Sequence, residues 1–196
     1  MQAEDTESYY FFSNDIPPGK SLRQVIEDIS HQPGVRFVAE FVGEHKIFGA
    51  VDHDTLEALQ SAIAESYIPN GLLSTWVRLD KASRIMAPKR GSPDFCAIVR
   101  VRTDGDPEDV LAAIDDRFEE RYRQDEPDHR RFGYGACTVT GSDFEILVDL
   151  GADTHPEVVR TARVDLGGVD GVLRPLRVAT AFLPGNAKRP GNPDES

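Results

Sequence analysis

Apolar and polar residues follow the same succession of patterns twice along the chain. An aromatic run near residue 10 predicts a strand, and apolar residues at helical spacing after Ser21 predict an amphipathic helix. Two alternating segments then meet at a turn at Gly43 and predict a hairpin. A second helix that Asp54 caps and a last strand over about 73–79 complete the first succession.

The second half of the chain repeats this order from Phe95 onward. An alternating strand leads to a helix that starts at Pro107, a hairpin turns around residues 141–143, a helix follows Thr154, and a final strand is predicted from Val172 to Phe182. This internal repeat is the strongest evidence for the fold, because each repeat is expected to form one structural unit. We predict an α+β protein of two tandem ferredoxin-like βαββαβ units that pair as a pseudo-dimer of the dimeric α/β-barrel type.

The same patterns set the predicted domain limits. The first unit is expected over residues 8–80 and the second over residues 94–183. Residues 81–93 have little periodicity and contain prolines, a glycine and four cations, which is typical of a linker. Residues 184–196 are rich in proline, glycine and charge, so we expect a disordered tail.

Charge and composition narrow the list of partners. The net charge of -12, from 34 acidic and 22 basic residues, argues against binding to a phosphate backbone. No apolar run approaches the roughly 20 residues that a bilayer span needs, and the acidic start lacks the basic region of a signal peptide. Cys96 and Cys137 lie in apolar strand-like runs and predict buried free thiols. We therefore expect a cytoplasmic protein with no direct nucleic-acid or membrane contact.

The sequence contains no recognisable catalytic signature. A phosphate-binding glycine loop, a nucleophile elbow and a Cys-x-x-Cys pair are all missing, and the five histidines do not form a ligand pattern. We predict no catalytic residues, no metal site and no cofactor. Asp143 and Glu145 lie two apart beside the second glycine turn, and Glu44 occupies the equivalent turn in the first half. These carboxylates suit an ammonium group or proton transfer, although a polar strand end facing water explains them equally well.

Short motifs around both hairpins resemble the effector-binding (RAM) domain of the leucine-responsive regulator/AsnC family. The matching segments are Pro33-Gly34-Val35, Val42-Gly43, Ser74-Thr75, Thr140-Gly141-Ser142-Asp143-Phe144, Gly168-Val169, Gly171-Val172 and Thr180. In that family two such domains pack their sheets together and bind amino acids or related molecules near the glycine turn. The resemblance implies a ligand site formed by Gly43, Glu44, Gly141, Ser142 and Asp143. The family's helix-turn-helix has no counterpart, because the first strand begins by about residue 9.

These observations lead to a main hypothesis and two alternatives. The main hypothesis is a small-molecule sensor, with amino acids as candidate effectors, or a partner-regulating protein without its own DNA-binding domain. It would act as a homo-oligomer or with a protein partner, and not as an enzyme. The first alternative is a cofactor-less dimeric α/β-barrel enzyme such as a monooxygenase. The second is a scaffold that binds no ligand.

Overall fold

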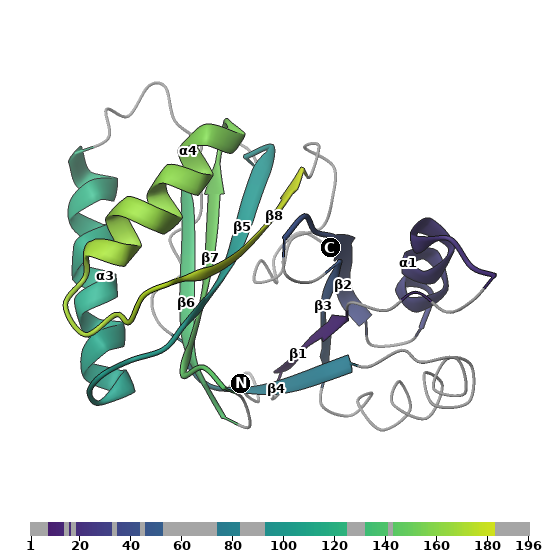
Figure 1. The fold of residues 1–196 in the computed structure, drawn as a ribbon, viewed down its shortest axis with the longest axis horizontal. Helices are drawn as coiled ribbons and strands as arrows, with labels where there is room; N and C mark the ends of the chain where they lie inside the picture. The colour runs from purple at the N-terminus through teal and green to yellow at the C-terminus, as the bar shows by residue number, and fades with distance from the viewer. Residues whose placement is uncertain are drawn as a thin grey trace, which may run out of the picture. The chain divides into compact units, whose positions relative to one another are not determined.

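The computed structural model is a mixed α+β fold with antiparallel strands, shown in Figure 1. It describes residues 8–13, 16, 19–32, 35–43, 46–52, 74–82, 93–124, 132–140 and 143–182. The chain divides into two compact units, Met1–Leu79 and Asp80–Ser196, which are described separately below.

Unit 1 is built on antiparallel strands with the order β2-β3-β1-β4. Its described elements are β1 (Ser8–Ser13), α1 (Leu22–Ser30), β2 (Val35–Glu40), β3 (Ile47–Asp52) and β4 (Ser74–Ala82). The last of these strands runs to Ala82, past the boundary of the unit at Leu79 and past the predicted end at residue 80. The predicted helix after Asp54 and most of the predicted linker lie outside the described residues.

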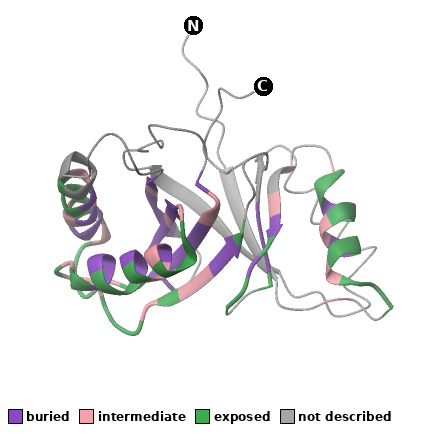
Figure 2. Ribbon diagram, turned by 90° about the horizontal axis from the view of Figure 1, so that it is seen from above, coloured by how far each residue is buried: buried purple, intermediate pink, exposed green. Residues whose placement is uncertain are grey.

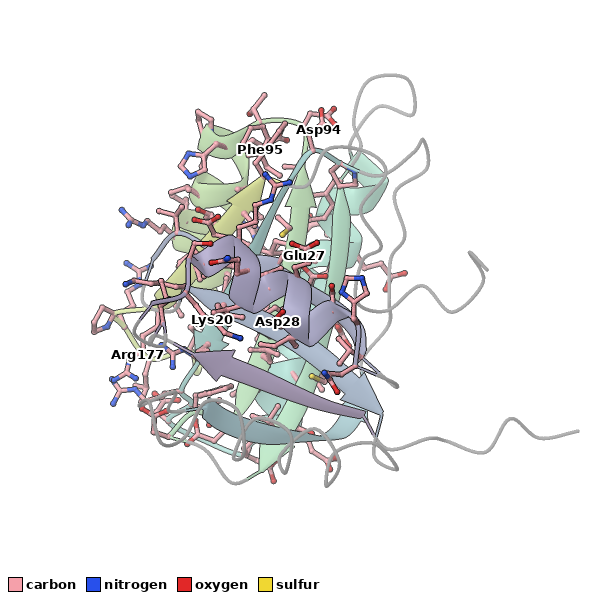
Figure 3. The ribbon with its side chains drawn as sticks, turned by 90° about the vertical axis from the view of Figure 1, so that its right-hand side faces the viewer. Lys20, Glu27, Asp28, Asp94, Phe95 and Arg177 are labelled. Atoms are coloured by element: carbon pink, nitrogen blue, oxygen red, sulfur yellow. The ribbon has the colours of Figure 1, made fainter. Side chains whose placement is uncertain are left out.

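Helix α1 begins where the sequence predicts, at a capping box on Ser21. The Ser21 hydroxyl accepts from the backbone N–H of Gln24, and the Gln24 side chain accepts from the Ser21 backbone N–H. Val25 and Ile29, four positions apart, form the buried stripe of the helix. On the exposed side Lys20 Nζ lies 2.6 Å from Asp28 Oδ2, and Figure 3 shows these two side chains turned toward each other.

Unit 2 repeats the antiparallel arrangement with the strand order β6-β7-β5-β8. Its elements are β5 (Phe95–Val101), α3 (Pro107–Gln124), β6 (Gly133–Thr140), β7 (Ile146–Ala152), α4 (His155–Arg160) and β8 (Arg177–Phe182). The α4 segment continues as a π-helical turn at Thr161–Asp165 and a short 3₁₀ turn at Leu166–Gly168. Both α3 and α4 lie on one side of the strands (Figure 1).

The main hydrophobic core of unit 2 lies between these helices and the sheet. Figure 2 shows buried inner stripes and exposed outer stripes on both helices. Phe118 of α3 stacks on Tyr134 of β6, with ring centroids 4.8 Å apart. The Tyr134 hydroxyl donates a hydrogen bond to Asp115 of α3, so a polar contact joins the same helix and strand. The helix face of the sheet is therefore filled by packing.

The final strand begins later than the alternation predicts. Val172 forms only an isolated bridge with Thr103, and the regular pairing with β5 starts at Arg177. Pro175 has no N–H to donate to a ladder, and the Arg174 side chain turns away to bond the Gly167 carbonyl. The predicted strand from Val172 was therefore wrong in its first five residues. The predicted tail lies outside the described residues.

Candidate functional site

The unit 2 sheet has two chemically different faces. Ala97, Val99 and Val101 of β5 belong to the core that α3 and α4 cover. The alternating residues point to the opposite side, here called the far face. Strand register assigns to it Cys96, Ile98 and Arg100 of β5, Gly135 and Cys137 of β6, Leu147, Asp149 and Gly151 of β7, and Arg177, Ala179 and Ala181 of β8.

A buried cation distinguishes the far face. Arg100 is only 8% exposed, and its strand neighbours Ile98 and Leu147 are buried apolar residues. The Arg100 guanidinium carbon lies 5.7 Å from the centre of the Phe144 ring. A buried guanidinium requires compensation by π-systems, hydrogen bonds or anions. This position therefore holds a buried guanidinium next to an aromatic ring.

A second guanidinium lies beside it at the more exposed end of the face. Arg177 of β8 is the direct cross-strand partner of Arg100. Its Nη1 donates to Asp143 Oδ2 at 2.8 Å, and both side chains are partly exposed. Because Asp143 directly precedes Phe144, one short segment contacts both guanidinium groups.

The next row of residues across the far face contains a carboxylate, between a glycine and an isoleucine. Asp149 of β7 pairs with Ile98, one row from Arg100, and is half-buried. Gly135 lies opposite Asp149 on β6, while Ala179 lies opposite Ile98 on β8. The far face therefore carries two cations on one row and a carboxylate on the next.

Two other polar side chains of unit 2 hold the ends of its elements. His155 is exposed at the start of α4, where Nε2 lies 3.3 Å from Thr180 Oγ1 and the ring contacts Phe95. Glu145 accepts a hydrogen bond from the Thr103 backbone N–H at 3.1 Å and ties down the segment after β5. These contacts position strands and helix ends. Within the described ranges, no three His, Cys, Asp or Glu side chains gather as a metal site.

Two of the five residues that the sequence singled out lie within the described part of the chain. Gly43 is exposed and has a φ of +144°, a turn conformation that favours glycine. Asp143 forms the ion pair with Arg177. Glu44, Gly141 and Ser142 lie outside the described residues. Arg100 was not among the predicted site residues, although one cation inside an apolar strand indicates a buried charge that could serve a function.

Comparisons with known proteins identify structural relatives only. Scans against protein families and curated sequences return no match. A candidate chlorite dismutase superposes with a TM-score of 0.57 at 11% identity, covering 91% of this chain and 95% of that one. A candidate monooxygenase from Lactobacillus acidophilus gives 0.56 at 9%, with coverages of 90% and 93%. An anthrone oxidase-like protein gives 0.55 at 12%, with 92% of each chain covered.

The chain shares its fold with these proteins. At such low identity the likeness concerns the fold alone, a mixed α+β fold whose neighbours are of the dimeric α/β-barrel kind. No helix in the described residues is long and apolar enough to cross a membrane.

The resemblance to the leucine-responsive regulator/AsnC effector domain was therefore wrong, and so was the sensor or partner-regulator hypothesis built on it. The structural neighbours are chlorite dismutase-like and monooxygenase-like proteins. The motifs that suggested the regulator family have local explanations. Gly171 has a φ of +81° in the turn before β8, and Thr180 faces α4 and contacts His155. Turn glycines and strand threonines recur in many α+β folds, so they identified the type of turn and not the family.

Proposed function

We propose that this chain is an oxidoreductase that uses the far face of the unit 2 sheet to oxidise a small aromatic substrate without a bound cofactor. The buried Arg100 guanidinium is the observation that carries the proposal. A preorganised cation in an apolar setting stabilises negative charge that develops during a reaction far better than the same cation in water. Three structural neighbours with names from oxidation chemistry support the same class of reaction.

The proposed reaction follows from the groups on two neighbouring rows. A CH₂ group activated by flanking aromatic rings, as in an anthrone, loses a proton to Asp149, and Arg100 stabilises the resulting anion. The anion passes its electrons to O₂, and the peroxide that forms on carbon collapses to a ketone and water. One oxygen atom enters the product and the other leaves as water, which balances the reaction.

The order of the strands supports a proposal about the fold of each unit. Each unit is proposed to be a ferredoxin-like βαββαβ repeat, over residues 8–80 and 94–183, because the orders β2-β3-β1-β4 and β6-β7-β5-β8 are equivalent. The turn at residues 141–143 is proposed to border the substrate site, and the turn at Gly43 and Glu44 is its counterpart in unit 1. A homo-oligomer and a cytoplasmic location remain predictions.

Oxygen uptake tests the proposed function directly. The purified full chain, dialysed against a chelator and given no cofactor, is mixed with anthrone and its hydroxylated derivatives in an oxygen electrode. Arg100→Gln and Asp149→Asn should each lower the turnover rate by about 100-fold. Arg163→Gln, which removes an exposed cation on the π-helical turn, should leave it unchanged.

Two further measurements make this experiment decisive. Circular dichroism checks that each variant is folded, and Arg100→Lys, which keeps the charge, should retain part of the activity. Equal oxygen uptake by wild type and the folded Arg100→Gln protein would contradict the proposed role of the far face. A requirement for an added cofactor would contradict the cofactor-independent reaction.

A further inference from the structure

The outer face of helix α3 is acidic along its first turns. Asp109, Ala112 and Asp116 follow one another at helical spacing, and all three are exposed. Figure 2 shows this exposed stripe opposite the buried side of the helix. The only cation between residues 107 and 120 is Arg117, and its Nη2 lies 3.9 Å from a carboxylate of the segment that follows α4. The exposed stripe of α3 is therefore negative.

The neighbouring helical segment exposes the opposite charge. Arg160 of α4 and Arg163 of the π-helical turn are exposed and lie three positions apart. Val164 beside them has 58% of its surface exposed. The two acidic residues of the same segment, Glu157 and Asp165, are half-buried and buried, respectively. The outer face of this segment is therefore positive next to an apolar side chain.

One surface of unit 2 thus carries both signs of charge in separate stripes, because α3 and α4 lie on the same side of the sheet (Figure 1). A two-fold interface between identical chains must be self-complementary, since each contact occurs twice. A two-fold rotation that lays α4 of one copy on α3 of the other meets this condition, with opposite charges at both contacts. The exposed Val164 and Ala112 then supply the apolar part of each contact.

We propose that two copies of this chain associate through the outer faces of α3 and α4. Arg160 and Arg163 of each copy pair with Asp109 and Asp116 of the other. Exposed ion pairs each contribute little affinity, so the dimer is reversible and the charge pattern mainly sets its orientation. This inference goes beyond the proposed oxidation and does not depend on it, because the groups proposed for that reaction lie on the far face of the sheet.

Salt dependence distinguishes this interface from a purely apolar one. The chain has a net charge of -12, so two copies repel each other overall. Salt would strengthen an apolar dimer by screening that repulsion, whereas it weakens a dimer held by complementary ion pairs. Sedimentation equilibrium of the full chain should therefore show a dimer at about 20 mM NaCl and dissociation toward the monomer at about 500 mM.

Exchange of charges between the two helices tests the pairing itself. Arg163→Glu and Asp116→Arg should each weaken association by about 10-fold or more, because each places like charges at both symmetric contacts. An equimolar mixture of the two variants should restore the dimer, since both contacts then join opposite charges again. Arg23→Glu and Glu27→Arg make the same changes at exposed positions of α1, so these matched controls should associate like wild type.

Each outcome decides the inference once circular dichroism has shown that the variants are folded. A monomeric wild type at low salt, or a dimer that becomes tighter with added salt, would overturn the interface. Control variants that weaken association as much as the α3 and α4 variants would also overturn it, because net charge alone would then explain the effect. If the mixed variants stay monomeric, α3 does not pair with α4 of the other copy.

Discussion

Replacing Gly171 by alanine should lower the free energy of unfolding by about 3 kcal/mol, because two independent costs meet at this residue. Its φ of +81° lies in the left-handed region, where a Cβ costs about 1–2 kcal/mol. The added Cβ would also lie 2.6 Å from Val110 Cγ2, which is far inside van der Waals contact. Val110 is a stiff β-branched residue on α3, so relieving this overlap costs about 1–3 kcal/mol.

A double-mutant cycle separates the two costs. Urea unfolding of the full chain, followed by circular dichroism, gives the free energy for Gly171→Ala, Val110→Ala and the double variant. Val110→Ala alone should cost about 2 kcal/mol, because buried methyl groups are lost. In the double variant the overlap disappears while the φ cost remains, so the sum of the single effects should exceed the double effect by about 1–3 kcal/mol.

Gly168→Ala is the matched control for this experiment. An added Cβ at Gly168 meets nothing within 4 Å, and its φ is not in the left-handed region. Its effect should stay within about 0.5 kcal/mol. The reasoning fails if Gly171→Ala is equally harmless, or if the effects of Gly171→Ala and Val110→Ala simply add.

Three other substitutions or reagents probe unit 2. Thr161→Val should raise the free energy of unfolding by about 1 kcal/mol, because the buried Thr161 hydroxyl has no hydrogen-bond partner in the described part of the chain; a lower melting temperature would contradict this. Tyr134→Phe should cost about 1–2 kcal/mol in urea unfolding by removing the bond to Asp115 while keeping the stacked ring, and an unchanged midpoint would refute it. Cys96 and Cys137 are buried thiols outside disulfides, so a thiol reagent should modify them only as fast as the protein opens; rapid labelling of the native protein would show otherwise.

Short sequence patterns predicted the helix starts and the strand starts that are determined by neighbouring residues. Ser21 and Thr154 were recognised as helix caps because a hydroxyl acceptor precedes an amphipathic run, and both accept the expected backbone N–H. Strand β5 starts at Phe95, where the alternation begins. The interruption before Arg177 depends on Pro175 and on the distant Gly167 carbonyl that Arg174 bonds. Alternation alone could not predict it.

The candidate site was harder to predict because it depends on strand register. The alternation showed Arg100 as the one charged residue of strand β5, without revealing its burial. Its pairing with Arg177 joins the first and last strands of unit 2, and such long-range register is not visible in a short window. Asp143 was singled out for its turn and not for the guanidinium that it contacts. Composition and turn motifs therefore located a neighbour of the arginine pair but not the pair itself.

The position of β5 also has a consequence for synthesis of the chain. It is the first strand of unit 2, yet its two neighbours in the sheet are β7 and the final strand, β8. One edge of β5 can pair once residue 152 has been made, while the other waits for residue 182. At about 5–20 residues per second the delay lasts a few seconds. During that interval the open edge of β5 can template pairing with a neighbouring nascent chain, and β8 covers that edge once it has been made.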